Sequence, residues 1–338
     1  MKLNGNYVRE FENPVYVASS AACVGKKESE GPLKDIMDVC FSDDGIGCSS
    51  WEDAEAKLIK TAVDLCLNKA EMNNKDIGAV FSGDLLNQCT ASTYGLRESD
   101  IPFLGLFGAC STMALSLSLA SVFVDSGYTE NALCVTSSHF CSAEKQFRYP
   151  LEYGAQRSPA SQRTVTGSGA FILSSTQKSP VVISRILFGK IVDLGISDTS
   201  NMGAAMAPAA AQSIADFLDD TGTTPQDYDL ILTGDLGKIG SDILLDHLMS
   251  RYHKDISSVH NDCGLLIYDL EKQDVHSGGS GCGCSATVMA SLIMKKMMCG
   301  ELKRILFAGT GALMSPLLSL QGETIPAICH IAEFNYRR

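Results

Sequence analysis

A cysteine at the start of an apolar segment is the residue in this sequence best placed to act as a nucleophile. Cys110 lies in the run FGACST, after a short apolar stretch and a glycine turn and before an uncharged segment with helical character. Backbone N–H groups and the dipole at a helix N-terminus lower a thiol pKa and bind oxyanions. Cys110 is therefore either an activated nucleophile or a small buried hydrophobe. The N–H group of Ser111 could bind a carboxylate in either case.

An aspartate follows a predicted strand in the first half of the chain. Asp84 closes the run IGAVFSGD, and open α/β sheets place ligands at the carboxyl ends of their strands. The same position suits an aspartate that only shapes a turn or caps the next helix. Asp235, in DLILTGDL, occupies the equivalent place later in the chain and has the same two interpretations.

A loop histidine is the third candidate. His260 opens the run HNDCG, in a segment that lengthens the interval between Asp235 and the next Cys-led helix. A histidine can donate to an anion, although in a loop it is usually only solvated. The cysteines that would make a zinc site with it are Cys263, Cys282 and Cys284. Structural zinc sites usually show two matched ligand pairs, which this spacing lacks, so we expect no metal.

A polar insertion over residues 139–164 contains the nearest cluster of cations. Its members are Lys145, Arg148, Arg157 and Arg163. Together they could surround a pocket for an anion, although any single one is more often solvated. We expect one insertion arginine to reach the site and take Arg148 as that residue.

The elements that must position these residues occur twice. Each half of the chain has a short strand ending in Gly-Asp-Leu, then a Cys-Ser pair that opens an apolar helical run closed by a glycine. A repeat of a whole α/β unit indicates two similar halves packed together, which we place at residues 1–178 and 179–338. The paired aspartates and cysteines then fall at corresponding places near a pseudo-twofold axis.

Periodicity predicts several individual elements. Apolar spacing indicates helices over residues 51–73 and 208–220, with Ser50 as the cap of the first. Strands are expected at residues 131–138 and, as a pair, over residues 181–195.

Composition excludes several classes of protein. The chain has 338 residues, of which 45% are hydrophobic and 20% charged, so a large core is expected and disorder is not. The net charge of −12 argues against a nucleic-acid partner and against adhesion to anionic lipid. Thirteen cysteines and an N-terminus without an apolar signal core indicate free thiols in a reducing cytoplasm. Residues 101–124 carry no charge, but their glycines, proline and serines favour a buried strand and helix over a membrane span.

The duplicated halves, the Cys-led central helix and the closing strand VTGSGAFIL resemble the thiolase superfamily, most closely its type III ketoacyl synthase group. The resemblance implies an α/β protein with a five-layer α-β-α-β-α fold, in which the two Cys-led helices form the central layer. It places Cys110 at the nucleophile position of those enzymes.

The chain departs from these enzymes where their other catalytic groups lie. The condensing enzymes carry Pro-His-Gln-Ala-Asn after the second-half strand, where residues 233–237 read TGDLG, and Gly-Asn near the second central helix, where residues 281–284 read GCGC. The histidine and asparagine that would stabilise an enolate or oxyanion are missing from these places. Because a nucleophile without its base and oxyanion donors transfers acyl groups poorly, we expect no enzyme activity.

A non-enzymatic family is similar to the chain along nearly its whole length, namely the stage V sporulation protein AD family. The segments that carry this resemblance include FENPVYV, SGDLLNQ, FLGLFGACST, SSHFCSAEKQFRYPLEYGAQ, GKIVDLGISD, DYDLILTGDLGKIGSDIL and HNDCGLLIY. The resemblance implies a protein of spore-forming bacteria that binds dipicolinic acid, free or as its calcium chelate. It implies action with the SpoVA membrane proteins in uptake of that ligand into the developing spore, and it associates the protein with transport and spore germination.

These inferences give a candidate ligand-binding site of Asp84, Cys110, Ser111, Arg148 and His260. Dipicolinate is a small flat dianion that needs cationic or N–H donors for its carboxylates and apolar walls for its ring. We expect the N–H groups around Cys110, together with His260 and one arginine, to be the donors. Asp84 fits if it keeps His260 charged, is protonated or binds Ca²⁺, and these alternatives stay open. No cofactor or resident metal is expected.

The expected location is the cytoplasm of the forespore or mother cell, with peripheral attachment to the spore inner membrane through protein partners, no nucleic acid and a homodimeric state. The alternative is an acyl-CoA condensing enzyme with Cys110 as nucleophile and His260 or His139 as a substitute base. A purely structural adaptor with a vestigial pocket is the third reading.

Overall fold

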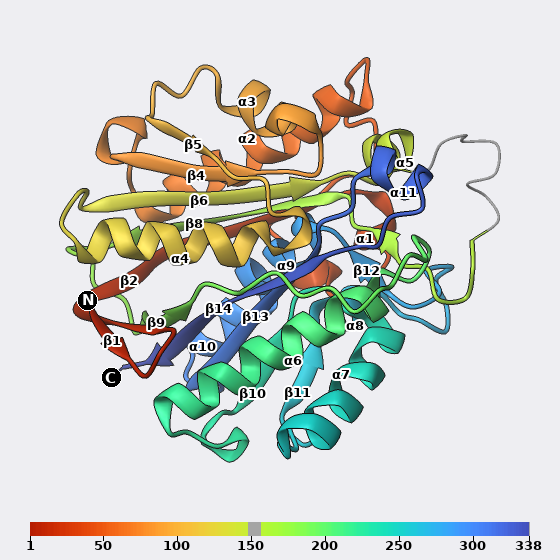
Figure 1. Cartoon of the computed structure of the whole chain (residues 1–338). Coiled ribbons are helices and arrows are strands. Elements are labelled where there is room, and N and C mark those ends of the chain that lie inside the picture. The colour runs from red at the N-terminus through yellow and green to blue at the C-terminus, as the bar shows by residue number, and fades with distance from the viewer. Residues whose placement is uncertain (148–156, 338) are drawn as a thin grey trace.

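The computed structural model describes residues 1–147 and 157–337, whose elements form five layers (Figure 1). The outer helices are α2 (Trp51–Ala70), α3 (Thr90–Leu96), α6 (Met202–Thr221) and α7 (Gly237–Tyr252). The inner helices are α4 (Thr112–Asp125) and α9 (Cys282–Val288), which lie between the two groups of strands. The predicted α-β-α-β-α order is thereby confirmed.

The strands repeat one order in the two halves. The first half contributes β2 (Val8–Val24), β4 (Ala79–Gly83), β5 (Phe103–Gly105), β6 (Asn131–Ser138) and β8 (Gly167–Ser174). The second contributes β9 (Val181–Leu187), β10 (Leu230–Thr233), β11 (His260–Asp262), β13 (Arg304–Ala312) and β14 (Ala327–Tyr336). The sheet order β11-β10-β13-β14-β9-β2-β8-β6-β4-β5 is symmetrical about the β9–β2 contact, as a duplication requires. The exact boundary of the halves near residue 178 stays a prediction.

One long strand joins the two layers. The first part of β2 pairs antiparallel with β9, from Arg9 to Tyr16, with an irregularity between Glu10 and Val15. From Tyr16 to Val24 the same strand pairs antiparallel with β8. The two groups of strands are therefore one hydrogen-bonded sheet, although they form separate layers around the inner helices.

The core between these layers explains the uncharged run at residues 101–124. Met113 and Leu117 of α4 pack in one apolar cluster with Phe81 of β4 and Phe307 of β13, so the cluster contains residues of both halves. The run is therefore a short strand, β5, followed by a helix buried in protein, as the sequence predicts. In the described part of the chain, no helix has both the length and the apolar character needed to cross a bilayer.

Local signals account for most element boundaries, with two exceptions. Ser50 caps α2 as predicted, because its Oγ accepts a hydrogen bond from the N–H of Asp53 at 3.1 Å. Helix α6 begins at Met202, six residues before the expected start, and Pro208 lies inside it. The buried alanine-rich face of α6 outweighs the one backbone hydrogen bond that a proline removes.

The second exception is the predicted pair of strands over residues 181–195. Only β9 forms there, and residues 188–200 run as a loop. A single bridge connects Val192 of this loop to Ala327.

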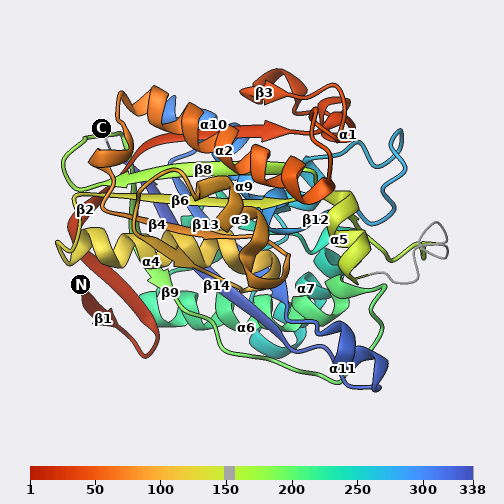
Figure 2. The same ribbon diagram turned by 90° about the horizontal axis from the view of Figure 1, so that it is seen from above.

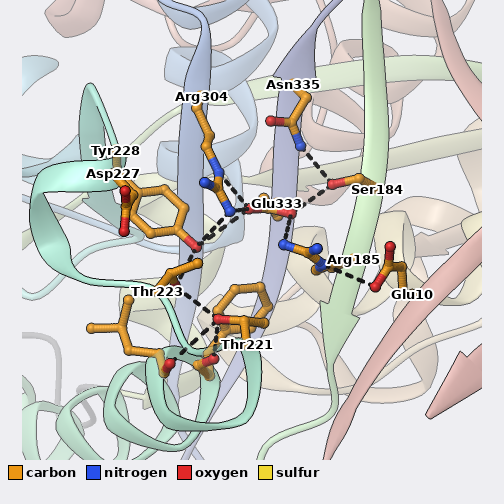
Figure 3. Close-up of polar contacts among 12 residues, drawn as sticks. Glu10, Ser184, Arg185, Thr221, Thr223, Asp227, Tyr228, Arg304, Glu333 and Asn335 are labelled. Atoms are coloured by element: carbon orange, nitrogen blue, oxygen red, sulfur yellow. Dashed lines mark hydrogen bonds and ion pairs between the residues drawn. The ribbon is translucent and has the colours of Figure 1, made fainter. Parts of the chain in front are cut away.

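A network of hydrogen bonds and ion pairs connects the strands where the two halves meet (Figure 3). At its centre is the buried carboxylate of Glu333 on β14, which accepts from Arg304 Nε of β13 at 2.8 Å. Ser184 of β9 donates to the other carboxylate oxygen at 2.6 Å. Arg185 lies 3.5 Å from that same oxygen and 3.4 Å from Glu10 of β2. The network thus links four neighbouring strands in the middle of the sheet, β13, β14, β9 and β2.

Candidate functional site

A cavity of about 650 Å³ opens beside Cys110. Four segments form most of its wall: the loop after β4, the turn before α4, helix α5 (Phe140–Phe147) and the chain leading into α11 (Pro316–Leu320). Its larger apolar residues are Phe107, Phe147, Met202, Leu313, Met314 and Leu317. Its polar residues are Asn87, Glu144, Gln146, Thr164, Ser280 and Ser315. Among the described lining residues, Glu144 is the only charged one.

The backbone around Cys110 is tightly constrained. Ala109 has a φ of 51°, in the left-handed region that costs energy for a residue with a Cβ atom. A Cβ on Gly311 of β13 would lie 2.6 Å from the carbonyl oxygen of Gly108, so only glycine allows this approach. Ser111 is buried and donates its Oγ hydrogen to the carbonyl of Gly108 at 2.6 Å, so its side chain is committed within the turn.

The thiol of Cys110 is not activated by its position. Its Sγ lies 3.9 Å from Ser280 Oγ, which donates to Oδ2 of Asp235 at 3.1 Å. Burial and the negative charge of Asp235 raise the pKa of Cys110 well above its usual value. These two effects on the pKa outweigh the opposite effect of the helix N-terminus, so the thiol stays protonated at neutral pH. The interpretation of Cys110 as an activated nucleophile is therefore not supported.

Asp235 lies behind Ser280 of the cavity wall, and three donors hold its carboxylate. Besides Ser280, Oδ2 accepts from the N–H of Gly281 at 2.8 Å, and Oδ1 accepts from Thr310 Oγ1 at 2.9 Å. Burial raises the pKa of Asp235 to about 7. The candidate set above omits both Asp235 and Ser280. The signal for Asp235 was present, because it stands in the segment where condensing enzymes carry a histidine, whereas nothing in the glycine-rich run singled out Ser280.

Asp84 lies beneath the cavity wall rather than on it. Its carboxylate accepts from the N–H of Leu86 at 2.9 Å, and from the N–H and Oγ of Ser92 at 2.8 and 2.7 Å. Its oxygens are therefore used to shape the loop that carries Leu85 and Asn87 into the cavity wall. This geometry matches the turn-shaping interpretation of Asp84, and the expected convergence with Cys110 in one cleft is not observed.

Asp84 also has a buried acidic neighbour. Glu55 of α2 accepts from Ser137 Oγ at 3.0 Å and from Ser142 Oγ of α5 at 2.6 Å. Burial first, and then the charge of Asp84, raises the pKa of Glu55 to about 8. A protonated Glu55 thus connects the outer helix α2 to the helix that lines the cavity.

His260 is also absent from the cavity wall. Its Nε2 lies 3.1 Å from Thr233 Oγ1, and the Thr233 hydroxyl donates to Asp262 at 2.6 Å. Burial lowers the pKa of His260 to about 4, so the imidazole is neutral at physiological pH. The expected charged donor is therefore not present at this position. The cysteines considered with His260 have other contacts: the Cys282 thiol donates to the carbonyl of Ser137 at 3.0 Å.

Metal-binding side chains are not gathered anywhere in residues 1–147 and 157–337: no group of three or more His, Cys, Asp and Glu residues there could hold an ion. All thirteen cysteines are free.

The insertion cations are distributed over separate contacts. Lys145 pairs with Glu52 at 2.7 Å, and Arg157 pairs with Asp274 at 2.7 Å. Arg163 lies over the ring of Phe140, 3.7 Å from its centre. Arg148 lies outside the described residues, so its expected contact with the ligand stays a prediction.

Comparison with known proteins gives the fold and the family. The chain is similar to 3-oxoacyl-[acyl-carrier-protein] synthase III from Aquifex aeolicus VF5, at 12% identity and a TM-score of 0.57, over 95% of this chain and all of that one. It is also similar to cerulenin-bound OleA of Xanthomonas campestris, at 14% identity and a TM-score of 0.62, over 97% and 98% of the two chains. At these identities the likeness shows a shared thiolase fold.

Sequence likeness is much closer to one sporulation protein. Stage V sporulation protein AD of Bacillus subtilis (strain 168) is 46% identical over 330 residues, which covers 98% of this chain and 97% of that protein. The family model for stage V sporulation protein AD matches residues 5–335. The chain therefore belongs to the stage V sporulation protein AD (SpoVAD) family.

Proposed function

We propose that this sporulation protein binds dipicolinic acid in the cavity beside Cys110 and does not catalyse acyl transfer. The observation that carries the proposal is that a ligand-sized cavity is lined by a cysteine that is not activated. The Cys110 thiol lies close to the Asp235 carboxylate, which raises its pKa. A cavity of about 650 Å³ falls within the range of small-molecule sites, roughly 300–1,000 Å³. The old catalytic position is then one wall of a binding site.

The cavity wall has the two kinds of surface that dipicolinate needs. Phe107, Phe147 and Met202 offer apolar contacts for the pyridine ring. Asn87, Thr164 and Ser280 offer polar groups that can donate to its carboxylates. We propose Arg148 as the cation that completes the site.

Calcium is proposed to enter with the ligand rather than as a resident ion. Glu144 brings carboxylate oxygens to the wall, and Ca²⁺ prefers oxygen ligands. Chelation also removes the charge of the dianion, which reduces its repulsion by buried carboxylates such as Asp235. The chelate should therefore bind at least as well as the free acid.

The same proposal places the protein in dipicolinate transport with the SpoVA membrane proteins, peripheral to the spore inner membrane on the cytoplasmic side, in the forespore or mother cell. The net charge of −12 supports attachment through proteins, because it disfavours direct adhesion to anionic lipid. A homodimer is proposed through β5, which ends the sheet and presents a free strand edge with Phe103 exposed.

The alternative function is an acyl-CoA condensing enzyme with Cys110 as nucleophile, which the shared fold favours. It lacks a base: the imidazole of His139 is buried, with Nε2 2.8 Å from the carbonyl oxygen of Asp44, and neither His139 nor His260 is among the described residues of the cavity wall. It predicts an acetyl group on Cys110 after incubation with acetyl-CoA, visible by intact-mass spectrometry. An unmodified protein after prolonged incubation would end this alternative.

Calorimetric titration tests the main proposal. Dipicolinate, with and without Ca²⁺, should bind saturably, whereas benzene-1,3-dicarboxylate, which has the same carboxylates but no ring nitrogen, should gain nothing from Ca²⁺. The variant Ala312→Phe fills the described cavity and should abolish binding, while Met249→Ala on α7 should not change it. Absence of saturable binding at millimolar dipicolinate, or unchanged binding by Ala312→Phe, would refute the proposal.

A further inference from the structure

Five large aliphatic side chains are exposed on two segments of the chain, the loop after β9 and helix α11. They are Ile191 (68% exposed), Leu194 (54%), Leu317 (66%), Leu318 (47%) and Leu320 (86%). Scattered exposed apolar residues are ordinary, but a contiguous group is typical of an interaction site. We call this group the mouth patch.

The loop that carries Ile191 and Leu194 is hydrogen-bonded to the stretch of chain that leads from α11 into β14. Val192 and Ala327 exchange both backbone hydrogen bonds at 2.8 Å, and the N–H of Ile325 donates to the carbonyl of Ile196 at 2.7 Å. Thr324 Oγ1 donates to Asp193 at 2.6 Å. In Figures 1 and 2 the chain that follows β9 runs up to α11. These contacts fix the position of the loop after β9 relative to the chain that follows α11.

The mouth patch adjoins the ligand cavity. Pro316 and Leu317 belong to the cavity wall, and Leu317 is also one of the exposed members of the patch. Leu318 and Leu320 continue the same short helix, α11, on the outside. A molecule seated on the patch would consequently contact the wall of the cavity.

The rim of the mouth patch is acidic. Asp193 and Asp198 are exposed beside it, and their carboxylates accept hydrogen bonds from the N–H groups of Gly195 and Ser200, each at 2.9 Å. Glu323 follows α11 and is exposed as well. Lys190, the one lysine of residues 188–200, is occupied elsewhere, 3.0 Å from Asp216 and 3.5 Å from the ring of Tyr7.

We propose that the mouth patch docks a segment of a partner protein that presents aliphatic side chains flanked by lysine or arginine. The aliphatic residues would bury the five exposed side chains, and the basic flanks would face the three carboxylates. A second copy of this chain would bring like charges together, and an anionic lipid surface would be repelled. Given the ligand site proposed above, such a partner would cover the cavity mouth and could receive or supply the ligand there.

A matched pair of peptides tests the proposal. The probes are two labelled 18-residue amphipathic helices with the same leucine face, one with lysine and the other with glutamate on its polar face. Fluorescence anisotropy should show saturable binding of the lysine peptide, weakened at least tenfold in Leu318→Ser/Leu320→Ser. The control is Met249→Ser on α7, whose side chain is about as exposed as that of Leu318, and it should leave binding unchanged. Equal binding of the glutamate peptide, or the same loss in the control, would overturn the proposal.

Two further measurements test whether a lipid surface or a second copy of this chain binds the mouth patch instead. Co-sedimentation with phosphatidylglycerol vesicles that is lost in the patch variant would assign the patch to lipid, and light scattering that shows a dimer dissolved by that variant would assign it to a second copy. Either result overturns the proposal. Calorimetry with dipicolinate on the wild type keeps the two proposals distinguishable. If the wild type binds the lysine peptide but not dipicolinate, only the proposed ligand is refuted. If it binds dipicolinate but not the peptide, only the docking surface is refuted.

Discussion

The carboxylate of Asp235 lies close to the thiol of Cys110, and the hydroxyl of Ser280 contacts both groups. The hydroxyl of Ser280 donates to Asp235 at 3.1 Å and lies 3.9 Å from the Cys110 sulfur. A negative charge next to a thiol disfavours the thiolate, whereas an imidazolium favours it. The group beside the Cys110 thiol is thus a carboxylate, which does not stabilise a thiolate.

Neutralising Asp235 should make Cys110 more reactive. In Asp235→Asn the negative charge beside Cys110 is gone, so the pKa of the thiol should fall, although burial still keeps it above its usual value. Alkylation of Cys110 by iodoacetamide at pH 8 should then be about tenfold faster for each unit by which the pKa falls. Peptide mass spectrometry gives the rate at Cys110 itself, with exposed Cys299 as the internal reference. An unchanged Cys110 rate in a folded variant would show that Asp235 does not control the thiol.

Stability should fall as pH rises from 6 to 8. Folding raises the pKa of Glu55 from an ordinary value near 4.5 to about 8, so between these values the folded protein holds a proton that the unfolded chain releases. The contribution of this group is greatest below about pH 4.5 and declines until about pH 8. Asp235 and Glu28, whose pKa values burial raises to about 7, act in the same direction.

Thermal or urea unfolding at both pH values measures this decline, which we expect to be on the order of 1–3 kcal/mol. Glu55→Gln should flatten the slope, and Glu52→Gln on the same helix should not. A wild-type protein that is more stable at pH 8 would contradict the assignment.

Removing Glu333 should destabilise the protein strongly. Arg304 and Arg185 would lose the buried carboxylate between them, a change that typically costs about 3–5 kcal/mol. Urea unfolding of Glu333→Ala measures the cost. The matched control, Glu10→Ala, removes the more exposed end of the same network and should cost below about 1 kcal/mol. Similar losses from the two changes would contradict a central role for Glu333.

The β5 edge should carry the homodimer. Phe103→Lys places a charge on the exposed side of this strand, and two such strands paired across a twofold axis would repel each other. Light scattering should report a dimer for the wild type and a monomer for this variant. Tyr128→Lys, at an exposed position after α4, is the control and should stay dimeric. A wild-type protein that is monomeric at micromolar concentration would refute the interface.

Local sequence predicted the positions of most helices and strands, with exceptions at α6 and after β9, and it was less informative about the site. The FGACST run correctly indicated a cysteine at the start of a buried helix, and Ser50 correctly indicated the start of α2. The role of Asp84 depends on Ser92, which comes near only when the following loop folds back. The contact of Asp235 with Thr310 spans 75 residues and depends on the register of two strands. No periodicity reports such a contact, so the charge around Cys110 became visible only in three dimensions.

The shared strand β2 has a consequence for how the molecule can move. Tyr16 is paired with Ser174 of one half and with Val182 of the other, so the halves have no hinge between them. Separating them would require rupture of the backbone hydrogen bonds that pair β2 with β8 and with β9. Any widening of the cavity would therefore come from local displacements of its wall, such as α5 and α11, and not from separation of the two halves. The two halves thus form one body, and they do not close over the cavity as two separate domains would.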